Sequence, residues 1–325
     1  MNKIYLLVLM TIFAIATQAV EPATISATVD GYSGRVIDFE FIDNPDNNNS
    51  YTYREGNLME FDVELDEPSL LKINAWVWLI VSPGDQIHLD IHYEGTSYKT
   101  AEIRGTEKAV LLNETIRDMR SSRLTKRYKM NPMAALVTLV PSDEYYQMTL
   151  VQWAEEKAML EAIKADVDPF AYHYIYSELE GTFMSNLVKY PYMASDVLKK
   201  PLEESFPKGY WEVLNDYQLR DDVASLKSFT YLGWLLEYMR YVQAREAHKQ
   251  NKPFNYFSAD LQKDYNSIIS FYEDTLLDSA LYVYLYSVIS QQHNDFEVVE
   301  QLTKDYIEKY NKNTTYKESL LNMLQ

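Results

Sequence analysis

Between Ala23 and Gly105, hydrophobic and polar residues alternate along several short stretches. A period of two places every second side chain on the same face of a strand, so that one face is buried and the other is solvated. Turn-forming residues such as Asp30-Gly31 and Pro83-Gly84-Asp85 separate the stretches. The pattern predicts a small antiparallel β-sandwich. Its inward positions are expected at Ile37, Phe39 and Phe41, at Met59, Phe61, Val63 and Leu65, and at Ile87, Leu89, Ile91 and Tyr93.

From Thr106 onward the hydrophobic residues recur at spacings of three and four, which is typical of amphipathic helices. Thr106 is a candidate N-cap for a helix that begins at Glu107. Two stretches, Phe229–Ala244 and Leu276–Ile289, are apolar over most of the helical circumference and are predicted to lie in the middle of a bundle. Helix breaks are expected at Pro132, Pro141, Pro169, Pro191, Pro201, Pro207 and Pro253.

These patterns predict an α+β protein in which a small antiparallel β-sandwich is followed by an irregular α-helical domain. We expect a signal peptide at residues 1–19, a β-sandwich domain at residues 20–105 and a helical domain at residues 106–325. A chain of 325 residues is long enough to bury a sizeable core in two such domains. No repeat of fixed period is evident, which makes a helical solenoid the less favoured arrangement.

The N-terminus, MNKIYLLVLMTIFAIATQAVEPA, has the layout of a secretory signal peptide. Lys3 supplies the positive charge, an apolar run extends from Ile4 to Ile15, and small residues follow at Thr17-Gln18-Ala19. The run is shorter than the roughly 20 apolar residues that a membrane-spanning helix needs, and no cysteine follows it for lipid attachment. We therefore expect an exported, periplasmic or envelope-associated protein with a cleaved signal peptide, no lipid anchor and no stable membrane insertion.

The composition narrows the classes of function. The net charge of −18 argues against a nucleic-acid partner and against binding to anionic lipid, and its simplest meaning is solubility. The chain has no cysteine, so disulfides, thiolate metal ligands and thiol nucleophiles are excluded. The protein therefore cannot carry out thiol redox chemistry by itself.

The stretch SPGDQIHLDIHYEGT, residues 82–96, places His88, Asp90 and His92 at alternate positions. These residue types bind metals, but two histidines four positions apart on a strand have Cα atoms about 13 Å apart. Their imidazoles would have to lean strongly toward one another to share an ion at about 2 Å. We favour the polar, solvated face of an ordinary strand, and predict no metal site and no cofactor.

Arg117, Arg120, Arg123 and Arg127 recur at helical spacing and form a basic stripe in an acidic protein. One interpretation is a site for an anion or an acidic partner. The other is a solvated helix face, or a face that packs against the acidic β-domain. We favour the second interpretation because runs of charge usually face water.

Tyrosine is dense in the helical region, as in Tyr172, Tyr174 and Tyr176 and again at 282–286. Exposed tyrosine rings can stack on sugars or on peptide side chains, since each ring has an apolar body and a polar tip. Buried rings are large core residues instead. The helical spacing favours the core interpretation.

Several segments resemble the N-terminal β-domain and helical region of exported TlpA/ResA-like thiol-disulfide oxidoreductases. They are Ile25–Gly31, Leu65–Pro68, Leu79–Ile87, Ala101–Gly105 with the later Asn113, Asp278–Leu281 and Asp305–Tyr310. In that family a thioredoxin domain with a Cys-x-x-Cys pair follows the helical region. This chain reaches Gln325 without a cysteine, so none of the family's catalytic residues has a counterpart here.

The resemblance implies an accessory part of such a protein without its catalytic domain. We therefore predict a non-catalytic exported accessory or interaction module that acts with a separate, exported thioredoxin-like protein. The alternative is a glycan- or peptide-binding protein that uses the tyrosine-rich helical domain. A cysteine-independent hydrolase is the third class, and no catalytic motif in the sequence supports it.

Overall fold

The computed structural model describes residues 21–42, 45–125, 133–258, 260–291 and 295–324. The predicted signal peptide at 1–19 lies outside the described residues. The strands are β1 (Ala23–Tyr32), β2 (Val36–Phe41), β3 (Asn49–Thr52), β4 (Leu58–Val63), β5 (Ser69–Ile73), β6 (Val77–Val81), β7 (Gln86–Gly95) and β8 (Ser97–Gly105). The helices are α1 (Glu107–Thr125), α2 (Met133–Leu139), α3 (Ser142–Ile163), α4 (Pro169–Leu198), α5 (Val223–Lys227), α6 (Phe229–Lys249), α7 (Leu261–Phe271), α8 (Asp274–Ser290), α9 (Phe296–Lys309) and α10 (Thr314–Met323). Short 3₁₀ helices are η1 (Pro45–Asn47), η2 (Leu202–Glu204) and η3 (Tyr210–Leu214).

The strands form two four-stranded sheets in the orders β4-β1-β7-β8 and β3-β2-β5-β6, and the alternating apolar side chains of both sheets share one core. The α+β fold class predicted from the hydrophobic pattern is thus confirmed. One pairing departs from the antiparallel expectation, because β1 and β7 run parallel, with Thr24 opposite Gln86. The chain visits the second sheet between β4 and β7, and such a crossover allows β7 to return in the same direction as β1.

The sheet that contains β5 and β6 is covered on both faces. One face meets the other sheet, while Leu70 and Ile80 point outward into a second core with Ile116 of α1 and Tyr174 and Leu179 of α4. This burial explains why β5 and β6 read as nearly continuous apolar runs rather than as alternating ones. The sandwich and the helical region therefore share apolar packing along this sheet.

At the edges of the sandwich, side chains form hydrogen bonds with backbone groups of the edge strands. The fully buried amide of Asn113, on α1, accepts a hydrogen bond from Ile80 N at 2.7 Å and donates one to Ile80 O at 2.8 Å. It thus binds the edge strand β6 as a neighbouring strand would. On the opposite side of the sandwich, Tyr51 Oη donates to the carbonyl of Glu60 on the edge strand β4 at 2.9 Å. An edge strand with occupied backbone groups is a poor template for a further strand.

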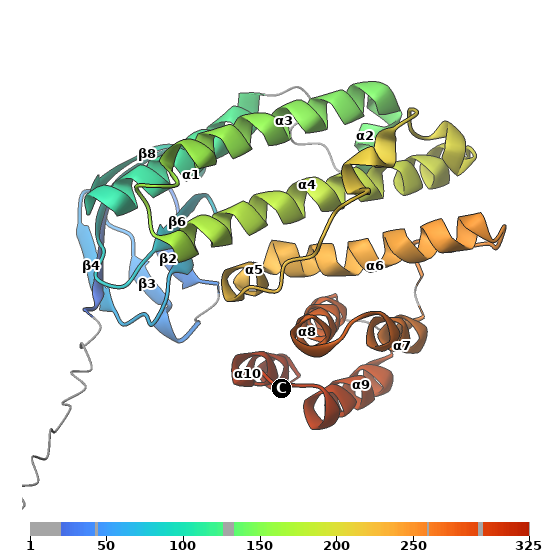
Figure 1. The fold of residues 1–325 in the computed structure, drawn as a ribbon. Helices are drawn as coiled ribbons and strands as arrows, with labels where there is room; N and C mark the ends of the chain where they lie inside the picture. Colours follow the sequence, from blue (N-terminus) through green and yellow to red (C-terminus); the bar gives the residue numbers. More distant parts are fainter. Residues whose placement is uncertain (1–20, 43–44, 126–132, 259, 292–294, 325) are drawn as a thin grey trace, which may run out of the picture.

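The helical region starts where the pattern predicts, at Glu107, but Thr106 does not cap the helix with its side chain. The hydroxyl of Thr106 accepts from Gln86 N instead, at 2.9 Å. The helices α3, α4 and α6 run side by side away from the sandwich, α7 and α8 pack against α6, and α9 and α10 pack beneath α7 and α8 (Figure 1). As predicted, α6 and α8 are buried over most of their circumference.

The prediction that Pro191 breaks a helix is wrong, because the 30-residue helix α4 continues through it to Leu198. A proline has no N–H for the carbonyl four residues earlier, which is Leu187 O. That carbonyl accepts a hydrogen bond from the hydroxyl of the buried Tyr210 at 2.7 Å. A tertiary contact thus replaces the lost helical bond, and the helix is preserved. Pro169, by contrast, lies at the first turn of α4, as expected for proline.

Within the described ranges, no helix has the length and apolar character needed to cross a lipid bilayer.

Candidate functional site

The tyrosines singled out in the sequence are mostly internal. Tyr172 and Tyr174 are each only 2% exposed and belong to the core between α4 and the sandwich. The hydroxyl of Tyr172 reaches Glu161 Oε1 at 2.7 Å, and burial beside that carboxylate raises the tyrosine pKa. These two rings have no free face on which a ligand could stack.

Tyr176 is half-buried, and neighbouring cations lie against its ring. The guanidinium of Arg220 lies 4.9 Å from the ring centroid, and Lys157 Nζ lies 5.7 Å from it. Trp153 meets the same ring edge to face at 5.8 Å. Cation–π contacts of this kind fix the ring within the protein surface. Tyr172 and Tyr176 stack with ring centroids 6.3 Å apart, and Lys164 Nζ lies 4.8 Å from the Tyr172 ring, so the three tyrosines form no open binding platform.

The basic stripe is engaged with the rest of the molecule. Arg117 donates to the carbonyl of Ala101 on the edge strand β8, and Arg120 stacks on Trp78 with its guanidinium 4.4 Å from the ring. Arg123 makes a bidentate pair with Glu156 on α3, both N–O distances being 2.6 Å. Arg127 lies outside the described residues. Arg117 and Arg120 thus contact the β-domain, as the packing interpretation proposes, whereas Arg123 binds helix α3.

His88, Asp90 and His92 lie on the outer face of β7, as the strand interpretation predicts. Their partners are side chains of the parallel strand β1: His88 Nδ1 lies 2.9 Å from Ser26 Oγ, and His92 pairs with Asp30. Among the described residues, no three His, Asp or Glu side chains converge as metal ligands. The two histidines thus turn to separate partners.

Ser26, His88 and Asp90 form a hydrogen-bonded chain that was not predicted from the sequence. His88 Nε2 lies 3.3 Å from Asp90 Oδ1, so the order is serine, histidine, aspartate. Hydrogen bonds from Thr28 and His88, with the charge of Arg104, hold the pKa of Asp90 below its usual range. Ser26 lies beside His88 because β1 and β7 pair in a parallel register. The periodicity of the sequence alone does not reveal which strands pair.

This chain of side chains lacks the rest of a hydrolytic site. Acyl transfer needs donors aimed at the oxyanion that forms in the transition state. Both β1 and β7 are interior strands, so their backbone N–H groups point along the sheet toward partner strands rather than outward. The serine is also only 9% exposed, between its neighbours on the sheet. We treat this network as polar pairing on the sheet surface.

A buried ionisable pair connects α4 to the segment before α5. Glu180 is only 6% exposed, and burial raises its pKa although Arg220 Nη1 lies 3.7 Å from Glu180 Oε2. Perturbed carboxyl groups are common in active sites. Here the hydroxyl of Tyr231 also binds Arg220, accepting a hydrogen bond from the backbone N–H of Arg220 at 2.6 Å. These contacts fix a connecting segment against two helices, which is a structural role.

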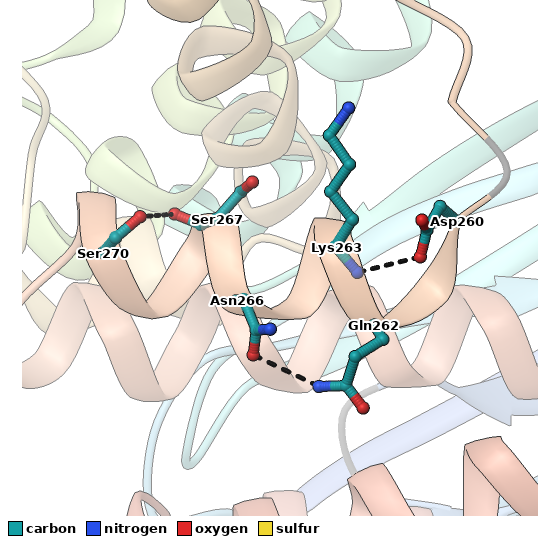
Figure 2. Close-up of a pocket in the computed structure, with 6 residues that line it drawn as sticks. All are labelled: Asp260, Gln262, Lys263, Asn266, Ser267 and Ser270. Carbon is teal, nitrogen blue, oxygen red and sulfur yellow. Dashed lines mark hydrogen bonds between the residues drawn. The ribbon is translucent and has the colours of Figure 1, made fainter.

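A hollow of about 520 Å³ lies on α7, and all its lining residues fall between Asp260 and Ser270; Figure 2 shows their side chains. Lys263 extends to one side of the helix, whereas Gln262 and Asn266 extend to the other (Figure 2). Asp260 caps the helix by accepting from Lys263 N at 3.0 Å. Side chains of one short helix that point apart cannot enclose a ligand, so we assign no site there.

A second hollow, which we call the α4–α6 groove, has a volume of about 640 Å³ and is built from several elements. It lies where α4 and α6 end, on the side of the helical region away from the sandwich (Figure 1). Its lining comes from the last turns of both helices, from η2, and from the loop of residues 252–257. Its volume is in the range of small-ligand pockets in proteins.

Both helices end at the groove in the same way. A residue with positive φ is followed by a lysine and a proline, as Lys199-Lys200-Pro201 and as Asn251-Lys252-Pro253. The N–H of each lysine bonds a carbonyl five residues earlier, at 3.2 Å in α4 and 2.8 Å in α6. This is a Schellman-type helix end, which fixes the direction in which the next residues leave. The two exit segments thereby diverge around the groove.

The floor of the groove consists of aromatic side chains, and a buried carboxylate beneath them fixes their position. Tyr192 and Tyr256 stack with ring centroids 3.9 Å apart. The hydroxyl of Tyr256 donates to Glu237 Oε2 at 2.5 Å, and burial together with this carboxylate raises the tyrosine pKa well above its usual value. Lys189 and Arg240 balance the buried Glu237, at 3.3 and 3.0 Å from its Oε1. A paired buried carboxylate holds the floor in one geometry.

The rim of the groove combines apolar rings with charge. Phe254 and Phe257 are 37% and 43% exposed. Two ion pairs are also exposed on the rim: Asp196–Lys199 at 3.1 Å and Glu203–His248 at 3.3 Å. The arrangement can hold an apolar side chain while polar groups meet its backbone or ends.

Sequence reasoning did not find this groove. Its residues come from positions 192–203 and 244–257, which only folding brings together. The available signal was NKPFNYF at 251–257, where three aromatic residues directly follow a helix end. Aromatic residues in a loop depart from the polar composition usual for connections.

In comparisons with known proteins, the chain matches no family model, no curated protein and no solved structure. The resemblance to TlpA/ResA-like proteins therefore stays a prediction.

Proposed function

We propose that the chain is a non-catalytic interaction module that binds a polypeptide segment in the α4–α6 groove. The observation that carries the proposal is the groove itself, with its anchored tyrosine floor and the two exposed phenylalanines Phe254 and Phe257. Rigid aromatic anchors in a preformed recess are the usual energetic centre of protein recognition. Export to the cell envelope, expected from the N-terminus, is the second part of the proposal.

A polypeptide fits the groove better than a glycan does. The backbone N–H groups of Phe254, Asn255 and Tyr256 have no hydrogen-bond acceptor among the described residues. An extended peptide presents carbonyls at regular spacing that can bind such donors. Glycan recognition instead uses an open ring face bordered by polar side chains. The floor rings stack on one another, and the exposed rings are phenylalanines without a polar tip.

The thioredoxin-like partner predicted from the resemblance is one protein that could supply such a segment. The peptide proposal does not depend on it, because the groove is described by its own chemistry.

The proposal is tested by selecting random dodecapeptides with free C-termini on the purified protein, followed by fluorescence anisotropy with synthetic peptides. We expect enriched peptides that bind the wild-type protein and bind the double variant Phe254→Ser, Phe257→Ser at least roughly tenfold more weakly, since apolar contact is lost at the centre of the site. The matched control is Val223→Ser with Phe296→Ser, which removes exposed apolar residues elsewhere. Circular dichroism confirms that both variants are folded. Failure to enrich any peptide, or equal loss in the control, would overturn the proposal.

A further inference from the structure

Around the groove, the acidic side chains have ion-pair partners, whereas one lysine, Lys252, has none among the described residues. Asp196 is paired with Lys199 at the end of α4, and Glu203 of η2 is paired with His248 of α6. No carboxylate of the described chain lies within ion-pair distance of the Nζ of Lys252, which also lines the groove. A cation without a partner, beside apolar rings in a protein of net charge −18, favours a ligand with a negative group.

The position of this lysine is fixed by the helix end rather than by its own side chain. The N–H of Lys252 bonds Ala247 O at 2.8 Å, Asn251 before it has a φ of 51°, and Pro253 after it restricts the exit. The next residue is Phe254, so an ammonium group and an exposed aromatic ring emerge two residues apart on the same wall. Any ligand that uses both must carry a negative charge close to an apolar surface.

Hydrogen-bond donors of the next residues in the chain lie close to Lys252. The side-chain oxygen of Asn255 accepts from Phe257 N at 3.2 Å, which sets the orientation of the amide. Its NH₂ group has no acceptor among the described residues, and the same holds for the backbone N–H of Phe254 and of Asn255. Backbone donors next to a cation are a recurring means of capturing a terminal carboxylate.

We infer that the α4–α6 groove recognises the C-terminal end of a polypeptide, with the terminal carboxylate at Lys252 and an apolar last side chain against Phe254 and Phe257. A C-terminal residue bears a carboxylate and its side chain on the same Cα atom, so it supplies both groups within a few ångströms. Aspartate and glutamate supply the charge but no apolar side chain. This inference rests on the peptide-binding function proposed above and specifies which part of a peptide is bound.

The test uses the peptides selected on the wild-type protein, each made as the free acid, as the C-terminal amide, and extended by two glycines. We expect the free acid to bind roughly three- to tenfold more tightly than the other two forms, as for a charge-assisted hydrogen bond at a partly exposed site. In Lys252→Met this preference disappears, because the free acid weakens while the amide is unchanged.

The matched control is Lys200→Met. Lys200 holds the same position in the same helix-end motif, at the end of α4, but does not line the groove. We expect it to leave both affinities unchanged. Equal affinities for acid and amide, or equal weakening of both forms in Lys252→Met, would overturn the inference while groove-dependent binding upholds the proposed function. If no selected peptide depends on Phe254 and Phe257, both proposals are overturned together.

Discussion

The β-sandwich is filled mainly by aliphatic side chains and phenylalanine, whereas the helical region is filled largely by tyrosine and leucine. In the helical region the tyrosine hydroxyls connect neighbouring elements by bonding to carbonyls or carboxylates. Examples are Tyr190 to Val140 O, Tyr210 to Leu187 O, Tyr272 to Leu235 O, Tyr284 to Leu261 O, Tyr306 to Asp278 Oδ1 and Tyr316 to Leu226 O.

The difference separates two ways of specifying a core. An aliphatic side chain needs only a place of the right size, so the alternation along a strand already determines which face it buries. A buried hydroxyl needs a particular acceptor, and leaving it without one costs roughly 1–3 kcal/mol. Burial raises the pKa of Tyr190 and of Tyr316 to about 12, so both remain neutral donors at ordinary pH. The helical core is therefore specified by polar pairs as well as by packing.

The largest effect is expected at Asn113, where the two regions meet. Replacing Asn113 by Leu removes two hydrogen bonds and leaves the N–H and C=O of Ile80 without partners in the core. We expect the free energy of unfolding to fall by about 2–5 kcal/mol, measured by urea denaturation.

The control for this substitution is Asn266→Ala on the exposed side of α7, which we expect to change stability by no more than roughly 0.5 kcal/mol. If Asn113→Leu were as mild as the control, side-chain binding of the β6 edge would not contribute to stability.

A smaller effect is expected where α4 and α6 approach closely at Gly181. A Cβ atom added there would lie 2.7 Å from the carbonyl oxygen of Thr230, which is backbone and cannot rotate away. We expect Gly181→Ala to destabilise the protein by about 1–3 kcal/mol in thermal or urea unfolding.

Gly233, on α6, provides the opposite case because a Cβ atom there meets nothing within 4 Å. Gly233→Ala should stabilise the protein by about 0.5–1 kcal/mol, as alanine is the better helix former. Destabilisation by both substitutions would show that helix packing is tighter throughout than the contact at Gly181 alone implies.

The smallest expected effect concerns pH and Glu180. Its folded-state pKa is raised by burial, so the folded protein holds the proton more tightly than the unfolded chain does. The contribution of Glu180 to stability is therefore greatest below the unfolded pKa of 4.5 and declines as pH rises through the folded value.

We expect the stability of the wild type relative to Glu180→Gln to decrease as the pH rises above the unfolded pKa of 4.5, measured by urea denaturation at a series of pH values. The comparison cancels groups common to both proteins. A relative stability that increased with pH would mean that Arg220 outweighs burial at this carboxyl.

Much of the fold could be predicted because it depends on local periodicity. The strands around Ile37–Phe41 and Ile87–Tyr93, and the central helices α6 and α8, follow directly from spacings of two and of three to four. The parallel pairing of β1 with β7 could not be predicted, because alternation determines which face is buried but not which strand lies alongside. Pro191 was misjudged because its compensation comes from Tyr210, which is distant in sequence.

Much less of the candidate site could be predicted from the sequence. Arg123 and Tyr172 were singled out by local pattern, and their partners Glu156 and Glu161 place them in structural contacts. The groove depends on two helix ends and a loop that meet only in the folded chain. Predicting it requires tertiary packing, although the aromatic loop after Asn251-Lys252-Pro253 marks one of its walls.

The place of β1 in its sheet also determines the order in which the chain can fold during synthesis. Although β1 is the first strand of the sandwich, it lies between β4, whose paired residues follow it by 30 to 40 positions, and β7, whose paired residues follow it by 62 or 63 positions. A growing chain therefore leaves backbone N–H and C=O groups of β1 without partner strands until both later strands have emerged from the ribosome, while β5 and β6 can pair at once as a hairpin. Translation must pass β7 before the first strand acquires both neighbours.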